Sequence, residues 1–409
     1  MSKPTNNNAL YLDHAATSWP KAPGVPEAMA DAMRDIAGSP SRGQHSGSRT
    51  GQDITAQTRQ RLADLTGEPD ASRVIFTPGC TDALQLAVIG TVDAYHRDHH
   101  RDHPGTTPRV IMTQLEHNAI RRALRHLAAL GRVELVEVAV ASHGIVDPAD
   151  IAAELTPNTA LVCVLAVSNV FGTAQPIAAI AEAVRAHPSD ALLLVDAAQA
   201  AGAMPLHDIA AHADYLAIGA HKSFRGPAGI GALRIGPRAI PDIADARSSR
   251  LAPIRFGGTG DGLGDDLPKA LPRRFEPGTP NLPAIAGFAA ALEHAAPEAV
   301  HEHKQQLTQR AHEALTSIAG LHAISPPDAL GLVTFNIDGS DPNDIAGILD
   351  VSFGMSVRGG LQCSPGAHAA AGTLDCNGAV RASFGVDTTE ADIDGLADAI
   401  DQIAGSVRT

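Results

Sequence analysis

Seven short apolar segments, separated by stretches with helical spacing, constrain the fold of this chain more than any other feature. They are expected to form strands at 74–76, 110–113, 133–138, 160–167, 192–196, 215–218 and 230–235. Between them, helices are expected at 81–95, 118–130, 147–155 and 177–186. Such alternation is typical of a mainly parallel sheet covered by helices on both faces. The sequence therefore predicts an α/β fold whose large domain contains a mainly parallel seven-stranded sheet.

The chain is long enough for a second, smaller core. With 409 residues, of which 44% are hydrophobic, two domains are expected. We expect an N-terminal arm at 1–20 that packs with the small domain, a large domain at 21–283, and a smaller α+β domain at 284–409. Residues 250–283 lack periodicity, and long irregular stretches of this kind are usually functional or disordered. Because ligands bind at the carboxyl ends of parallel strands, functional residues are expected there.

Composition excludes several classes of partner. Acidic residues outnumber basic ones by 45 to 31, which gives a formal net charge of -14, so nucleic acid is not an expected partner. The polar N-terminus lacks the apolar segment of a signal peptide, and no apolar run approaches the roughly 20 residues of a membrane span. The four cysteines are too few and too scattered for a disulfide framework. These features favour a cytoplasmic protein with reduced thiols and no membrane contact.

The stretch 192–231 places a carboxylate and a lysine at the ends of successive strands. The apolar segment LLLVD ends in Asp196, and the next strand leads to His221 and Lys222 in a glycine-rich loop. Pyridoxal 5′-phosphate (PLP) needs a lysine for its Schiff base and a carboxylate that keeps its pyridine nitrogen protonated. The alternative is a core-edge aspartate and a surface lysine that never meet. The spacing of the pair favours PLP as the cofactor.

The motifs of this stretch resemble those of the class V aminotransferase group of PLP enzymes, and within it the cysteine desulfurases and the related selenocysteine lyases. VDAAQ at 195–199 is similar to the family's Asp-x-x-Gln strand end, and GAHKSFRGPAGIG at 219–231 is similar to its lysine loop. The resemblance extends from YLDHAAT at 11–17 to RASFG at 381–385. It implies PLP fold type I.

A strand-to-helix turn, TPGCT at 77–81, is suited to the cofactor phosphate, because backbone amides and the helix dipole there favour an anion. The resemblance implies that Thr81 and His221 contact the phosphate, and Cys80 stands beside them where relatives commonly carry a hydroxyl residue. Gly219 replaces the usual Ser or Thr. One phosphate hydrogen bond, worth about 1 kcal/mol, is therefore expected to be missing or replaced by water.

A further contact is implied by FEPGTPN at 275–281, which resembles the family segment that crosses a dimer interface. Thr279 would then reach the cofactor phosphate of the partner subunit, and each site would be complete only in a homodimer. The alternative is a proline-rich loop between the two domains.

Other site residues follow from the same resemblance. His117, in LEHNA, would stack on the pyridine ring, and Gln199 would hydrogen-bond its phenolic oxygen. Asn169, in SNVFGT, would lie near the substrate carboxylate, which Arg381, in VRASF, would bind through its planar guanidinium. His45 is expected at the mouth of the site, where it either gates the substrate or supports the loop.

The segment SVRGGLQCSPGAH at 356–368 distinguishes a desulfurase from a transaminase. Arg358 and Cys363 lie in a glycine-rich, partly polar loop, which is a poor environment for a packing cysteine and a good one for a reactive thiol. The loop resembles the catalytic-cysteine loop of desulfurases that pass sulfur to a separate acceptor protein. It departs from many relatives at Gln362, where they carry His.

The resemblance implies desulfuration of L-cysteine to L-alanine. Lys222 would move the α-proton, Cys363 would take the sulfur as a persulfide, and His117 would assist at the ring. A selenocysteine lyase uses the same residues and is an alternative. Further alternatives are another class V lyase, transaminase or epimerase in which Cys363 is inert, and a dimeric scaffold without catalysis.

A histidine-rich segment, HRDHHRDHP at 96–104, has spacing compatible with zinc or nickel at His96, His99, His100 and His103. The segment contains no cysteine, and its flanking charges favour a solvated surface. No metal site is therefore expected.

Overall fold

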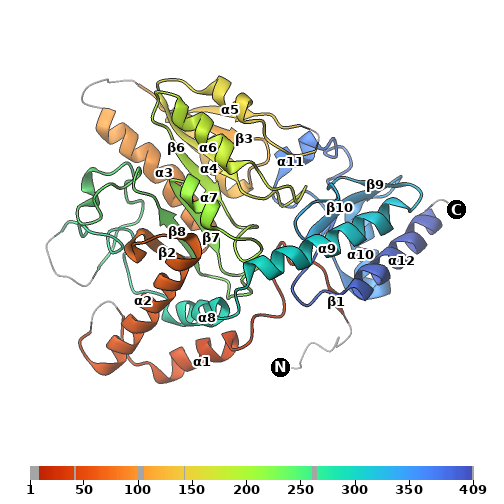
Figure 1. Ribbon diagram of the computed structural model, residues 1–409, viewed down its shortest axis with the longest axis horizontal. Helices are drawn as coiled ribbons and strands as arrows, with labels where there is room; N and C mark the ends of the chain where they lie inside the picture. Colours follow the sequence, from red (N-terminus) through yellow and green to blue (C-terminus); the bar gives the residue numbers. More distant parts are fainter. Residues whose placement is uncertain (1–8, 41–42, 100–105, 142, 260–264, 408–409) are drawn as a thin grey trace.

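The computed structural model describes residues 9–40, 43–99, 106–141, 143–259 and 265–407, and a seven-stranded sheet forms its centre (Figure 1). In spatial order the strands are β2 (Val74–Thr77), β8 (Gly231–Ile235), β7 (Tyr215–Gly219), β6 (Leu192–Asp196), β5 (Thr159–Leu165), β3 (Arg109–Thr113) and β4 (Glu134–Val138). Only β8 runs antiparallel to its neighbours. All seven predicted strands are present with ends within two residues of expectation, so the mainly parallel sheet is confirmed.

Helices cover both faces of this sheet, as the continuous apolar strands require. On β6, Leu192 and Leu194 pack toward α3 (Cys80–His99) and α4 (Asn118–Ala129). Leu193 and Val195 point to the opposite face, because successive strand residues alternate. That face is covered by α2 (Ser46–Thr66), α5 (Pro148–Glu154), α6 (Ile177–Ala186), α7 (His207–His212) and α8 (Leu282–Leu292), with α1 (Val25–Asp35) packed on α8. Each fully buried aliphatic side chain contributes roughly 1.5–3 kcal/mol.

The apolar spacing of α2 begins only at Ile54, after a polar, glycine-containing stretch, but the structure is already helical from Ser46. The polar first turns are helical because their glycines allow close approach. Gly51 lies against Pro40 and Leu282, and a Cβ at Gly47 would collide with the Ala37 carbonyl. This packing is a tertiary effect that helical periodicity does not report.

The smaller domain contains an antiparallel sheet of β12 (Val380–Ser383), β10 (Leu332–Ile337) and β9 (Leu321–Ala323). Its helices are α9 (Pro297–Thr316), α10 (Pro342–Phe353), α11 (Pro365–Ala370) and α12 (Glu390–Val407). In the N-terminal arm, β1 (Leu10–Tyr11) pairs in parallel with β11 (Met355–Ser356), and Leu12 joins the buried core of this domain. The smaller α+β fold expected from the sequence is therefore present.

Helix α8 packs with the large domain. Ile285 and Phe288 are buried in the same cluster as the α2 and β6 side chains, whereas α9 buries Leu307 and Ala311 in the smaller core. The expected boundary at residue 284 would assign α8 to the small domain. On this packing, we propose that the domain division lies between α8 and α9, and that the long helix α9 carries the chain from one core to the other (Figure 1).

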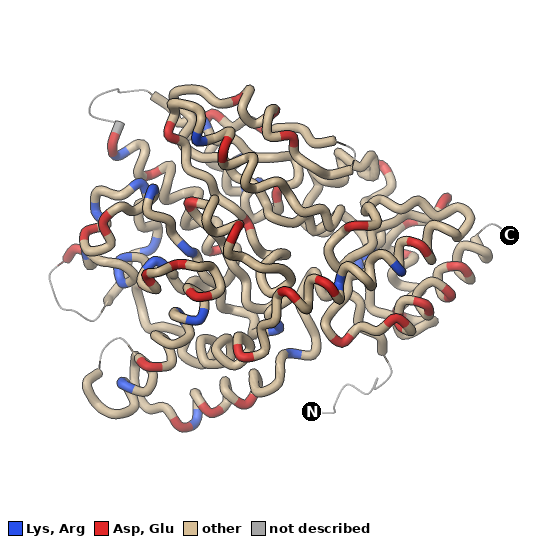
Figure 2. Tube along the Cα trace, viewed as in Figure 1, with Lys and Arg blue, Asp and Glu red and all other residues tan. Residues whose placement is uncertain are grey.

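Acidic residues recur on the outer helices of the smaller domain (Figure 2). Helix α12 alone carries Glu390, Asp392, Asp394, Asp398 and Asp401. Within the described ranges, no helix is both long enough and apolar enough to cross a membrane.

Candidate active site

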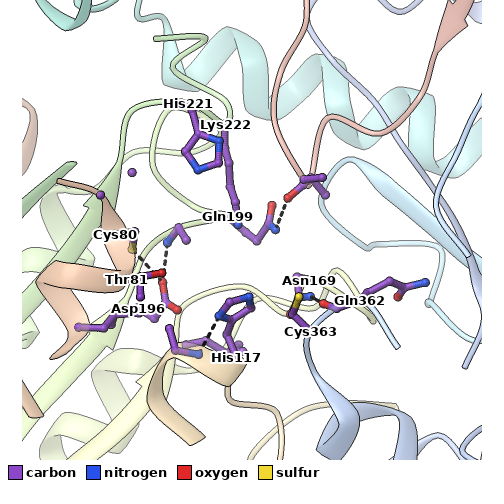
Figure 3. A pocket seen from close by; sticks show the side chains of 18 of the residues that line it. Cys80, Thr81, His117, Asn169, Asp196, Gln199, His221, Lys222, Gln362 and Cys363 are labelled. Atoms are coloured by element: carbon purple, nitrogen blue, oxygen red, sulfur yellow. Dashed lines mark hydrogen bonds between the residues drawn. The ribbon is translucent and has the colours of Figure 1, made fainter. Parts of the chain in front are cut away.

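A cavity of about 450 Å³ lies at the carboxyl ends of the parallel strands. Its walls come from loops of the large domain, from the N-terminal arm and from the smaller domain (Figure 3). The structure brings together most of the residues predicted for the site. Those that line the cavity are Cys80, Thr81, His117, Asn169, Asp196, Gln199, His221, Lys222, Arg358, Cys363 and Arg381.

The turn between β2 and α3 forms one end of the cavity. Thr77 Oγ1 donates to the Gly79 carbonyl at 2.9 Å and tightens the turn. Cys80 and Thr81 open α3, so their amides belong to the first turn, which has no carbonyl partner within the helix. A Cβ at Gly79 would meet no atom within 4 Å, which shows open space beside these amides. The turn is therefore suited to an anion such as a phosphate.

Asp196 ends β6 and is only 5% exposed. Its Oδ1 accepts a hydrogen bond from the Ala198 amide at 2.8 Å and lies 3.6 Å from Cys80 Sγ, which donates to it. Burial, and then the Asp196 carboxylate, raise the pKa of Cys80 well above its usual value, so this thiol stays protonated. A buried carboxylate at the edge of a cavity is suited to a cationic partner, such as a pyridinium nitrogen.

Lys222 lies in the loop that follows β7. Burial lowers its pKa, and the nearby Asp196 carboxylate opposes that shift. Burial and the charge of Lys222 lower the pKa of His221 to about 4, so His221 is neutral at pH 7. The arm fixes this loop, because the Ser18 amide and Thr17 Oγ1 donate to the His221 carbonyl at 2.9 and 3.1 Å. A buried amine of lowered pKa is a suitable nucleophile for a carbonyl group.

His117 and Gln199 face the cavity between its two ends (Figure 3). His117 is the N-cap of α4, and its Nδ1 accepts from the Ala119 amide at 3.1 Å. That bond leaves the proton of the neutral ring on Nε2. Burial lowers the pKa of His117, with Asp196 opposing. Gln199 Nε2 donates to the Ala15 carbonyl at 3.0 Å and so ties this side chain to the arm.

Arg381 forms the opposite end of the cavity and is 2% exposed. Its Nη1 donates to the Asn169 carbonyl at 2.9 Å, and its Nη2 lies 3.0 Å from Asp13 Oδ1. Its Nε is buried and has no hydrogen-bond partner within the described structure. Burial lowers the pKa of Arg381, and Asp13 counteracts this. A buried guanidinium with a free donor is suited to a further carboxylate.

The loop that carries Cys363 enters the cavity from the smaller domain. Gln362 and Cys363 both have positive φ angles, 46° and 62°, which cost roughly 1–2 kcal/mol per residue outside glycine. Hydrogen bonds from the large domain hold the loop: Asn169 Nδ2 donates to the Gln362 carbonyl at 2.7 Å, and the Asn118 amide donates to the Cys363 carbonyl at 2.9 Å. Ser364 Oγ donates to Asn169 Oδ1 at 2.8 Å. Cys363 is exposed beside Asn169 (Figure 3).

Two predicted site residues lie away from this cavity. His45 is exposed at the N-cap of α2, where its Nε2 is 3.2 Å from Ser48 Oγ. Thr279 is exposed on the loop before α8 and does not line this chain's own cavity. In the histidine-rich segment, His96 Nε2 donates to the Arg132 carbonyl at 2.8 Å. His100 and His103 lie outside the described residues.

Asp13 and Glu116 do not line the cavity but lie next to residues that do, and neither was predicted. Asp13 lies in the YLDHAAT motif, and its contact with Arg381 joins two ends of the chain. Glu116 precedes His117 and is fully buried; its Oε1 accepts from Thr113 Oγ1 at 2.8 Å and from the Leu165 amide at 3.1 Å. Burial raises the pKa of Glu116 to about 8, so the carboxyl is protonated at pH 7. The sequence feature that could have identified Glu116 is a glutamate just after an apolar strand.

The family model for class-V aminotransferases matches residues 10–396. The chain therefore belongs to the class-V aminotransferase family. Its relatives there include a protein of Halalkalibacterium halodurans named "Probable cysteine desulfurase", 31% identical over 399 residues that cover 96% of this chain and 92% of the relative. A cysteine desulfurase of Haloferax volcanii is 30% identical over 405 residues, covering 96% and 88%.

Solved structures agree with this assignment. The apo structure of a cysteine desulfurase from Thermococcus onnurineus superimposes with a TM-score of 0.86 at 26% identity and covers 98% of this chain and 96% of that one. The expected family and PLP fold type I are thus confirmed.

Proposed function

We propose that this protein is a PLP-dependent cysteine desulfurase that converts L-cysteine to L-alanine and transfers the sulfur through Cys363. The observation that carries the proposal is the placement of an exposed thiol, Cys363, in the same cavity as Lys222 and Arg381. A transaminase needs the lysine and the arginine but has no use for the thiol. The names of the relatives support the same activity.

The chain's residues fit PLP at one end of the cavity. The first turn of α3 and Thr81 would bind the phosphate. Asp196 would contact the pyridine nitrogen, and Lys222 would bond to the aldehyde carbon. His117 would lie on the ring, and Gln199 would contact its phenolic oxygen. When bound, PLP supplies an electron sink for negative charge at the substrate α-carbon.

The other end of the cavity fits the amino acid. Arg381 and Asn169 would orient the α-carboxylate, and Lys222 Nζ would take the proton from the α-carbon, a role suited to an amine of lowered pKa. Cys363 Sγ would then attack the substrate sulfur. The substrate C–S bond breaks, an S–S bond forms, and a thiol plus L-cysteine becomes a Cys363 persulfide plus L-alanine.

The fate of the sulfur and the assembly are also proposals. The persulfide on the exposed Cys363 would pass to an acceptor protein, and Thr279, exposed on the loop before α8, would complete the partner's phosphate site in a homodimer. The four free thiols favour a reducing compartment such as the cytoplasm. Selenocysteine would meet the same residues and is a second candidate substrate.

The experiment compares wild type with Cys363→Ala and Cys376→Ala after PLP loading. Each protein receives L-cysteine and a reductant, and alanine and sulfide are quantified. We expect matched alanine and sulfide from wild type and from Cys376→Ala, which removes an exposed thiol outside this cavity. Cys363→Ala should lose at least about 100-fold of both, because it lacks the nucleophile. Absence of alanine from wild type would overturn the proposal.

A further inference from the structure

Lys304 is a buried lysine on α9 that no step of the proposed reaction uses. It is 7% exposed, and burial lowers its pKa to about 8. Its Nζ donates to Ser223 Oγ at 3.0 Å. Ser223 directly follows Lys222 in the loop after β7. A side chain of the helix that carries the chain from one core to the other therefore contacts the loop of the proposed Schiff-base lysine.

The surroundings of Lys304 supply no compensating negative charge. Among the described residues, Lys304 forms no ion pair with a carboxylate. His14 faces it, and burial together with the Lys304 charge lowers the pKa of His14 to about 4, so this ring is neutral at pH 7. Arg225 also lies near His14 and pairs with Asp387 at 3.0 Å. Because a desolvated amine without a carboxylate is costly, stability alone does not account for Lys304.

Close packing directs the Lys304 side chain toward this loop. A Cβ at Gly331 would come within 2.6 Å of Lys304 Cδ, so glycine leaves the room that the aliphatic stem occupies. Thr308 Oγ1 accepts from the Gly331 amide at 3.1 Å and donates to the Lys304 carbonyl at 2.9 Å. On the other side of the contact, Gly202 packs against the Ser223 backbone. The bond from Lys304 to Ser223 thus joins two closely packed segments.

The loop turns sharply at Lys222 and is held on both sides of this residue. Before it, the His221 carbonyl accepts hydrogen bonds from the N-terminal arm. After it, the Arg225 amide donates to the Lys222 carbonyl at 2.7 Å, and Arg225 has a positive φ of 60°. Such a conformation needs support from the surrounding structure. The bond from Lys304 to Ser223 provides support on this second side.

We propose that Lys304 is a positioning residue for the reaction: through its hydrogen bond to Ser223, it holds the loop that presents Lys222 Nζ to the cofactor and to the substrate α-carbon. Lys304 does not line the cavity, so its effect passes through Ser223. The inference rests on the proposed function, because it assumes that Lys222 bonds to PLP.

The test measures how fast the PLP-free protein takes up PLP, from the change in cofactor absorbance as Lys222 bonds to it. Lys304→Met removes the amine and keeps a side chain of similar length. Uptake should become about tenfold slower, because a hydrogen bond from a charged group is lost. The free energy of unfolding, measured without PLP, should stay equal or rise, because a desolvated amine is removed. A merely structural role would lower this free energy and leave uptake unchanged.

Ser223→Ala is the reciprocal variant. It should slow uptake by a similar factor but destabilise the protein, because Lys304 then lacks its acceptor. The double variant should be no slower than either single variant, because both changes break the same bond. Ser249→Ala is the matched control: it removes a buried hydroxyl of the large domain that donates to the Ala246 carbonyl at 2.7 Å, and uptake should not change. Additive effects in the double variant, or unchanged uptake by Lys304→Met, would overturn the proposal.

If Lys304→Met does not fold, the comparison of Ser223→Ala with Ser249→Ala decides the question, and equal uptake rates would overturn the proposal. PLP uptake requires no turnover of L-cysteine. A wild type that takes up PLP but forms no alanine would therefore overturn the proposed function, while the uptake rates still test the role of Lys304. A wild type that takes up no PLP would overturn both.

Discussion

The two ends of the cavity are built in different ways. At the proposed cofactor end, Asp196 and Lys222 follow adjacent parallel strands, and the sheet register fixes their separation. At the proposed substrate end, Arg381 and Cys363 belong to the smaller domain and are held by hydrogen bonds that cross to Asn169 and Asn118. The first arrangement depends on the core of one sheet, and the second on the contact between two domains.

This difference indicates that the two ends can be disturbed separately. A change at the cofactor end acts on buried, desolvated groups and should alter stability or cofactor binding. A change at the substrate end should alter substrate binding or sulfur transfer while the cofactor stays in place. The three variants that follow test this separation.

Arg381→Lys should have the largest effect on catalysis. Lysine keeps the positive charge near Asp13 but lacks the planar guanidinium group, which also donates to the Asn169 carbonyl. We expect kcat/KM for L-cysteine to fall about 100-fold, mainly through KM, because truncating a buried charge pair costs roughly 2–5 kcal/mol. PLP loading, measured by absorbance, should be unchanged.

Arg234→Lys provides the control, because Arg234 is also buried and paired, at 2.8 Å from Glu68, but lies away from the cavity. It should lower stability without changing KM. Loss of PLP from Arg381→Lys would show that the two ends are coupled and would contradict the comparison.

Glu116→Gln probes the cofactor end through the dependence of stability on pH. Its pKa rises from 4.5 to about 8 on folding, so between these values the unfolded state is ionised while the folded state keeps its proton. The free energy of unfolding that Glu116 contributes to the wild type therefore falls as pH rises through that range. Glutamine does not titrate, so the variant should gain on the order of 3 kcal/mol relative to wild type between pH 5 and pH 8.

Chemical denaturation of both proteins at pH 5, 6.5 and 8 measures this difference. Glu68→Gln is the contrasting variant, because it leaves Arg234 without its carboxylate and should destabilise the protein. A free-energy difference between Glu116→Gln and wild type that does not change with pH would show that Glu116 is ionised in the folded protein.

That Asp196 and Lys222 lie together was predictable from sequence, whereas the contacts at the proposed substrate end were less so. Asp196 and Lys222 follow apolar segments that the local sequence alone identifies as strands. Because ligands bind at the carboxyl ends of parallel strands, the two residues were expected to lie together. Asp13 meets Arg381 across 368 residues of sequence, through a β1–β11 pair only two residues long. Periodicity carries no information about such a contact.

The placement of His45 at the mouth of the site stays a prediction. What local sequence did not indicate is that close packing of Gly47 and Gly51 makes this segment the start of α2. The positive φ angles of Gln362 and Cys363 also could not be predicted from residue propensities, because contacts with the other domain hold these residues in that conformation.

Ser364→Ala should have the smallest effect and tests how the Cys363 loop is held. Ser364 Oγ donates to Asn169 Oδ1, and Asn169 in turn donates to the Gln362 carbonyl. Without the hydroxyl, Asn169 loses one of its two constraints, and the loop that bears two residues of positive φ becomes less well positioned. We expect alanine formation to fall about fivefold, equivalent to roughly 1 kcal/mol, with KM nearly unchanged.

Ser325→Ala separates positioning from stability. Ser325 is a buried serine of the smaller domain whose Oγ accepts from the Thr334 amide at 2.9 Å, and it does not line the cavity. Both variants should lower the free energy of unfolding by a similar amount, but only Ser364→Ala should slow alanine formation. Equal activities would mean that the Ser364 hydroxyl is not needed to position the strained loop, and that the bonds to the Gln362 and Cys363 carbonyls suffice.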